Sequence, residues 1–157
     1  MVARPDGKEN LLGILSTVMK KFAEITARYV DRPFERYTCM GFLYSFYREL
    51  NVAVPNIFED LTLDNYMDHY RKNPRETQIR MLKLIRSLGR PSKATLPHLG
   101  DLMVIAQNTT KKTVIPPGFF PAVYVGKEQC LTSFLRTGVT TFKLDRNHRA
   151  IVARRMI

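Results

Sequence analysis

Residues 37–50 read YTCMGFLYSFYREL, and the fold is inferred outward from this stretch. Its apolar residues recur at helical spacing, and those expected to face the core are Phe42, Leu43, Phe46, Tyr47 and Leu50. The helix is expected to begin near Thr38, whose hydroxyl suits an N-cap, and to end near Leu50, before Pro55. Cys39 then lies in the first turn, where free backbone N–H groups and peptide dipoles favour a thiolate.

The composition is that of a single globular domain. The chain has 157 residues, of which 45% are hydrophobic and 25% charged, so it is long enough to bury a core. A formal net charge of +11 favours encounters with polyanions such as nucleic acid, anionic lipid or anionic wall polymers. The two cysteines, Cys39 and Cys130, lack zinc-type spacing and are too few for a disulfide scaffold, so we expect free thiols, no metal and no cofactor.

The first 36 residues are expected to form an N-terminal helical segment. Residues 11–19 are apolar enough for the core of a signal peptide, but Lys20 and Lys21 follow where a small-residue cleavage site belongs. Asp6 and Glu9 have capping-box spacing, and a helical apolar stripe follows at Leu11, Ile14, Leu15, Val18, Phe22, Ile25 and Tyr29. We therefore expect a cytoplasmic chain without a membrane span; a trimmed leader or another export route stays open.

Residues 56–97 are expected to form a helical insertion within the domain. One or two helical turns are predicted in the acidic and aromatic stretch 56–70, and Pro74 introduces a longer helix that ends near Gly89. The predicted apolar face of this helix consists of Ile79, Leu82, Ile85 and Leu88. The candidate anion-binding residues are Arg80, Lys83, Arg86 and Arg90, for which a solvated surface is the plainer explanation.

The hydrophobic period changes from helix to strand after Leu99. Short strands separated by turn residues are predicted at 102–106, 122–125, 129–134, 139–144 and 150–156. Helices followed by strands are typical of an α+β domain, with N-terminal helices packed on a small, predominantly antiparallel sheet. The late strands are expected to form a meander.

Three short motifs, in order, resemble the NlpC-type cell-wall peptidases, which are papain-like enzymes. Residues 37–42, YTCMGF, resemble the family's Tyr-Asp-Cys-Ser-Gly-Phe nucleophile motif, and residues 100–102 match its Gly-Asp-Leu marker. Residues 120–126, FPAVYVG, align with the histidine strand His-Val-Gly-Ile-Tyr-Val-Gly. The resemblance implies a papain-like fold for residues 37–157, with Cys39 as nucleophile and Thr132 at the family's third polar position.

The chain departs from this family at the positions that carry chemistry. The resemblance places substrate contacts at Tyr37, Thr38, Met40 and Phe120, and Phe120 stands where the catalytic histidine belongs. Phenylalanine cannot exchange a proton, and loss of a positioned acid/base costs roughly 10²–10⁴-fold in rate. We therefore expect an impaired or inactive peptidase relative that binds a peptide, a cell-wall fragment or a protein partner.

Two alternatives remain open. One is an active cysteine hydrolase or acyltransferase that acts on peptidoglycan peptides with a displaced base, for which His69 in the insertion is the leading candidate. His98 and His148 are weaker candidates, because each suits a surface or capping role. The other alternative is a basic module that binds nucleic acid or another polyanion. Phe119 and Phe120 are expected either to plug the cleft or to line an apolar pocket in it.

Overall fold

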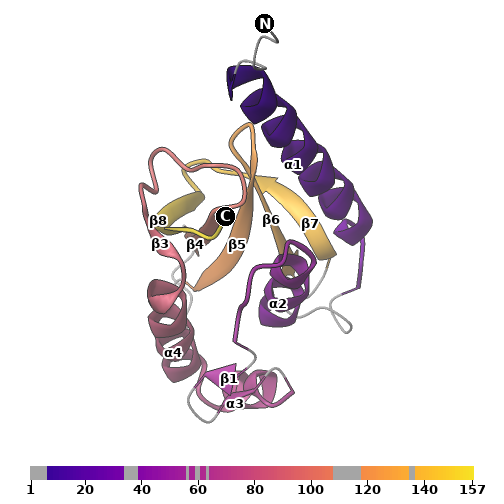
Figure 1. The fold of residues 1–157 in the computed structure, drawn as a ribbon. Helices are drawn as coiled ribbons and strands as arrows, with labels where there is room; N and C mark the ends of the chain where they lie inside the picture. The colour runs from indigo at the N-terminus through magenta and orange to yellow at the C-terminus, as the bar shows by residue number, and fades with distance from the viewer. Residues whose placement is uncertain are drawn as a thin grey trace, which may run out of the picture.

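The computed structural model describes residues 7–33, 39–55, 57–58, 61–62, 64–107, 118–134 and 137–157. Its helices are α1 (Gly7–Tyr29), α2 (Cys39–Glu49), α3 (Tyr66–Lys72) and α4 (Pro74–Ser87) (Figure 1). The first strands are β1 (Ile57–Phe58), β2 (Leu61–Thr62) and β3 (Arg90–Ser92). The remaining strands are β4 (Leu102–Gln107), β5 (Phe119–Gly126), β6 (Gln129–Phe134), β7 (Gly138–Lys143) and β8 (His148–Arg155). The predicted α+β class is confirmed.

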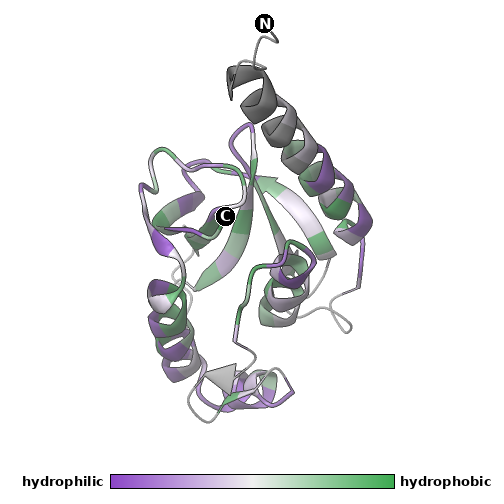
Figure 2. Ribbon diagram, in the orientation of Figure 1, coloured by the Kyte–Doolittle hydropathy of each residue, from purple (hydrophilic) through white to green (hydrophobic). Residues whose placement is uncertain are grey.

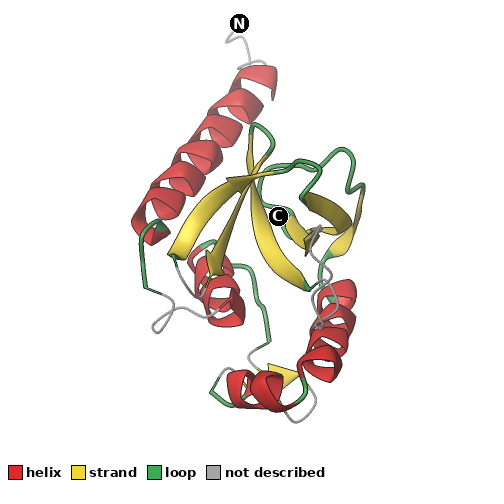
Figure 3. Cartoon of the chain, turned by 180° about the vertical axis from the view of Figure 1, so that it is seen from behind, coloured by secondary structure: helices red, strands yellow, loops and turns green. Residues whose placement is uncertain are grey.

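Six strands form one antiparallel sheet in the order β3-β8-β4-β5-β6-β7, seen from behind in Figure 3. Strands β4 to β7 follow one another as a meander, as predicted. The last strand differs from this expectation, because β8 crosses back and pairs with β4, with Met103 opposite Ala153. β3 lies within the segment 56–97 that was predicted to be a helical insertion, and it pairs instead with the other edge of β8 in the main sheet.

The sheet separates two hydrophobic cores, because successive side chains of a strand point to opposite faces. The larger core packs against α2 and includes Leu131 and Val123, whereas the smaller contains Cys130 and Ala122. α2 packs on β5 and β6. Its predicted core residues Phe42, Leu43, Phe46 and Tyr47 are buried, and Leu50 packs partly buried at the edge of the same core. In Figure 2 the central strands are mostly hydrophobic.

α1 is fixed to α2 and to the edge strand β7. The ring of Phe22 lies 5.5 Å from that of Phe46, edge to face. After the helix, the Asp31 N–H donates to the carbonyl of Val139, and the Val139 N–H donates to the carbonyl of Arg32, both at 2.8 Å. Gly138 has a φ of +70°, and a side chain there would collide with the Arg32 carbonyl oxygen. Asp6 lies outside the described residues, so the expected capping box stays a prediction.

The insertion contains the predicted helices and a short β1-β2 hairpin that the sequence did not indicate. α4 packs with a face that matches the predicted one in part: Ile85 is buried and Leu82 and Leu88 pack against the larger core, whereas Ile79 is 44% exposed. Thr77 and Met81, outside the predicted row, are also buried. The predicted apolar row was therefore wrong at Ile79, since contacts with α3 and the sheet turn the helix by a fraction of a turn. None of the described helices combines the length and apolar character needed to cross a membrane.

Candidate functional site

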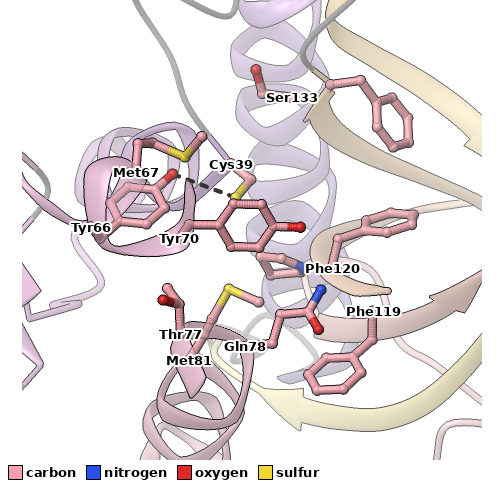
Figure 4. Close-up of a pocket in the computed structure, with 12 residues that line it drawn as sticks. Cys39, Tyr66, Met67, Tyr70, Thr77, Gln78, Met81, Phe119, Phe120 and Ser133 are labelled. Carbon is pink, nitrogen blue, oxygen red and sulfur yellow. Dashed lines mark hydrogen bonds between the residues drawn. The ribbon is translucent and has the colours of Figure 1, made fainter. Parts of the chain in front are cut away.

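A cavity of about 270 Å³ lies where the N-terminus of α2, the insertion helices α3 and α4, and the strands β5 and β6 meet (Figure 4). None of the described residues that line it has a charged side chain, although the chain carries a net charge of +11. The lining residues are Cys39, Tyr66, Met67, Tyr70, Thr77, Gln78, Met81, Phe119, Phe120, Pro121, Ser133 and Phe134. Phe119 and Phe120 therefore line a pocket, one of the two roles expected for them.

Cys39 is the first residue of α2, as predicted, and Tyr66 of α3 lies directly against it. The Tyr66 hydroxyl oxygen is 3.5 Å from the Cys39 Sγ and accepts the backbone N–H of Met40 at 3.2 Å. Because the tyrosine oxygen already accepts this N–H, its own proton can be donated to the sulfur. Tyr66 thus accepts a hydrogen bond from the Met40 N–H, a backbone donor at the start of α2 that would otherwise be free for a ligand.

The expected thiolate at Cys39 is not supported. Burial raises the pKa of the Cys39 thiol above its ordinary value of 9.0. The hydrogen bond from Tyr66 and the backbone N–H groups of Met40 and Cys39 lower it, but they offset the burial only in part. Desolvation of a charged sulfur outweighs the helix N-terminus here, so Cys39 is a protonated thiol at neutral pH.

Two further polar groups are directed into the cavity. In Figure 4 the Tyr70 hydroxyl points across it, and the amide of Gln78 lies beside Phe119 and Phe120. Neither side chain forms a hydrogen bond with the residues that the structure describes. The cavity thus combines an apolar wall with uncharged groups that can donate or accept a hydrogen bond.

No histidine is among the lining residues. His69, the displaced-base candidate, lies on α3 with its Nδ1 2.6 Å from the Thr77 hydroxyl oxygen. The Thr77 hydroxyl donates to the Asn73 carbonyl at 2.9 Å, so Nδ1 of a neutral His69 carries the proton and donates. His98 is exposed, and His148 lies 5.2 Å, centroid to centroid, from the Phe142 ring. His69 and His148 are thus held in contacts with other side chains, and neither lines the cavity.

Phe120 and Thr132 lie on the two strands against which α2 packs, as the resemblance implies. Phe120 shares the cavity wall with Cys39, but its ring also packs edge to face with Phe134, 5.1 Å between centroids. The buried Thr132 hydroxyl donates to the Pro121 carbonyl at 2.8 Å and does not line the cavity. Cys130 belongs to the smaller core, and burial raises its thiol pKa to about 12.

Of the other substrate-contact candidates, only Met40 is described, and it is not a lining residue of the cavity. The Met40 side chain is buried in the larger core. Tyr37 and Thr38 lie outside the described residues, so their expected roles stay predictions. Among the described residues, no group of three histidine, cysteine, aspartate or glutamate side chains could hold a metal ion.

The anion-binding candidates differ in their environments. Arg80 is only 20% exposed at its side chain and pairs with Glu76 at 3.0 Å. Lys83 and Arg86 are exposed on α4, and Arg90 is exposed at the start of β3. These three residues form no ion pair within the described part of the chain.

Asp101 of the Gly-Asp-Leu motif has a structural role. Its buried carboxylate accepts the Ser92 hydroxyl and the His98 backbone N–H, both at 2.8 Å, and lies 3.3 Å from Nε of Arg155. These contacts connect the segment before β4 to β8. Nearby, the Tyr47 hydroxyl donates to the Gly100 carbonyl at 2.8 Å and so joins α2 to the same turn.

Sequence reasoning missed most of the cavity wall. Tyr66 and Tyr70 are four residues apart, and Gln78 and Met81 are three apart, so each pair lies on one face of its helix. This spacing was a usable signal once the stretch 56–70 was expected to be helical. It did not indicate which faces meet Cys39.

No known family profile matches the chain, and no curated protein resembles it closely enough to count as a relative. Function is therefore inferred from the residues of the cavity and of the surface.

Proposed function

We propose that this chain is a binding domain without peptidase activity, which holds a large uncharged side chain of a peptide ligand in the cavity beside Cys39. The observation that carries this proposal is that the described residues of the cavity wall are all uncharged, in a strongly basic chain. A charged group entering this wall would lose its hydration without gaining an ion pair there, which is costly. A neutral apolar group gains from the same transfer.

The size of the cavity limits what enters it. Typical small-molecule sites measure roughly 300–1,000 Å³. At about 270 Å³, this cavity suits one side chain of the size of leucine, methionine or phenylalanine rather than a whole oligopeptide. Met67 and Met81 contribute flexible thioether side chains to its wall, which adapt to different apolar shapes.

The uncharged polar groups suit the amide that accompanies such a side chain. A peptide group has one donor and one acceptor, and both the Gln78 amide and the Tyr70 hydroxyl can serve as either. A ligand that enters with an apolar side chain brings its peptide group to the cavity mouth. We therefore infer that these two residues help to select a peptide over a bare hydrocarbon.

The state of Cys39 favours binding over hydrolysis. Its thiol is protonated at neutral pH, and the described lining residues include no imidazole to remove that proton. Peptide hydrolysis requires both a thiolate and a proton donor for the leaving amine. Tyr66 also engages the Met40 N–H, an additional obstacle to placing a substrate carbonyl at the start of α2.

The test is NMR titration of the ¹⁵N-labelled chain with capped amino acids, each with an acetyl and an amide end. We expect the phenylalanine, methionine and leucine compounds to shift resonances of cavity residues, and the lysine and glutamate compounds to leave them unchanged. Gln78→Trp should abolish these shifts by filling the cavity, whereas Ile79→Trp, its exposed neighbour on α4, should preserve them. Equal response to charged and apolar compounds would contradict the proposal.

A further inference from the structure

The outer face of α4 carries a row of cations. Arg75, Lys83 and Arg86 lie within about 80° of one another around the helix axis, at 3.6 residues per turn. All three are exposed, and the opposite side of the helix is buried through Thr77, Met81 and Ile85. We call Arg75, Lys83 and Arg86 the α4 basic face. In Figure 2 the visible side of α4 is mostly hydrophilic.

These charges are not neutralised within the described part of the chain. Arg75, Lys83 and Arg86 form no hydrogen bond or ion pair with the described residues, whereas Arg80 on the adjacent row pairs with Glu76. Glu76 is the only acidic residue of α4. The three cations are therefore available to an external anion.

α4 is held firmly in place behind this face. The guanidinium of Arg154 on β8 donates from Nε to the Leu88 carbonyl at 2.6 Å and from Nη2 to the Gly89 carbonyl at 3.1 Å. These bonds tie the C-terminal end of α4 to the sheet. The neighbouring Arg155 is engaged with Asp101 and Ser92. Arg154 thus supports the helix, and neither arginine is part of its basic face.

We propose that the α4 basic face binds the phosphodiester backbone of nucleic acid without sequence preference. From Arg75 to Arg86 the helix rises about 16 Å, at 1.5 Å per residue. One strand of duplex DNA presents a phosphate about every 3.4 Å along its axis, so three cations in this row each meet a phosphate. An extended polyanion matches a face of cations that runs along the helix, and this charge complementarity identifies the partner.

A lipid surface fits this face less well. Helices that bind membrane interfaces insert a broad apolar side into the lipid. The apolar side of α4 is buried in the protein, and Ile79 is the one large apolar residue exposed on its outer face. Binding through phosphate contacts does not involve the cavity, because Thr77, Gln78 and Met81 approach it from the inner side of α4.

The test is fluorescence anisotropy with a labelled, mixed-sequence 20-base-pair DNA duplex over a range of salt, roughly 50 to 200 mM. The variant Arg75→Ala/Lys83→Ala/Arg86→Ala is compared with Lys20→Ala/Lys21→Ala/Arg48→Ala. The control also removes three exposed helical cations and so the same net charge. We expect the first variant to bind at least about tenfold more weakly and to lose about 2.7 from the slope of log K against log salt, at 0.9 per phosphate contact. The control should keep nearly all of the slope.

Three outcomes would overturn this inference. Equal losses of affinity in both variants would mean that binding depends on net charge and not on the α4 basic face. The absence of measurable DNA binding by the wild type would exclude nucleic acid as the partner. Binding to vesicles of phosphatidylserine and phosphatidylcholine, without binding to DNA, would assign the face to lipid instead. Thermal unfolding monitored by circular dichroism checks that both variants are folded. The triple glutamine variant, Arg75→Gln/Lys83→Gln/Arg86→Gln, replaces the alanine variant if the latter is unfolded.

Discussion

The Tyr66 hydroxyl lies 3.5 Å from the Sγ of Cys39 and accepts the Met40 N–H at 3.2 Å, so one tyrosine of the insertion both contacts the thiol and caps the helix that carries it. The sequence placed Cys39 at a helix N-terminus. Tyr66 and the surrounding burial determine the chemical state of the thiol there.

The first prediction concerns the reactivity of this thiol. Tyr66→Phe removes a hydrogen bond that lowers the pKa of Cys39, so the pKa rises further above 9.0 and the thiolate fraction at pH 8 falls. Iodoacetamide should therefore label Cys39 more slowly in the variant at pH 8, and the midpoint of the rate against pH should move upward. Peptide mapping by mass spectrometry distinguishes Cys39 from the buried Cys130. Faster labelling in Tyr66→Phe would mean that the tyrosine acts by blocking access.

The second prediction concerns catalysis. We expect no detectable hydrolysis of peptidoglycan stem peptides by the wild type, since its Cys39 is protonated and no histidine lines the cavity. Phe120→His introduces an imidazole into the wall that Cys39 shares. Turnover gained by this variant and lost again with Cys39→Ala would identify the missing base as the limiting deficiency. Strong wild-type turnover that depends on Cys39 would contradict the proposed function.

The third prediction concerns the buried Asp101. Asp101→Ala leaves the Ser92 hydroxyl and the His98 N–H without their acceptor and should lower the free energy of unfolding by about 3 kcal/mol. Arg155 adds less to this loss, because its side chain is about one third exposed and reaches water. Urea denaturation measures the change. As a control, the exposed Asp64→Ala should stay within about 0.5 kcal/mol of the wild type.

The fourth prediction compares two glycines. Gly138→Ala should destabilise the chain by at least about 2 kcal/mol, since φ is positive there and the new methyl group would strike the Arg32 carbonyl oxygen. Gly13→Ala, on α1 with open space around it, should be stabilising by up to about 1 kcal/mol because alanine favours a helix. Both are measured by thermal unfolding. Similar effects at the two positions would refute the packing of residues 31–32 against β7.

Much of the architecture was predictable from local pattern. The apolar spacing through Phe46 predicted α2 with its buried face, and the change of period after Leu99 predicted the strands of an antiparallel sheet. These features leave a periodic spacing of apolar residues within one short stretch, so the sequence expresses them directly. The face of α4 was not predictable in the same way. Ile79 is exposed although it is apolar, because α4 is oriented by contacts with α3 and the sheet.

The sequence by itself determined the α+β class, the position of Cys39 at the start of a helix, and the excess of positive charge. Only the tertiary structure decided that Tyr66 would meet that cysteine and that Tyr70 and Gln78 would share its cavity. It also decided that Arg80 of α4 pairs with Glu76, whereas Arg75, Lys83 and Arg86 form no ion pair with the described residues. The physical reason is that the free energy of a charged or polar group depends on its burial and on its hydrogen bonds to segments far apart in sequence. The local spacing of apolar residues does not encode which distant segments come into contact.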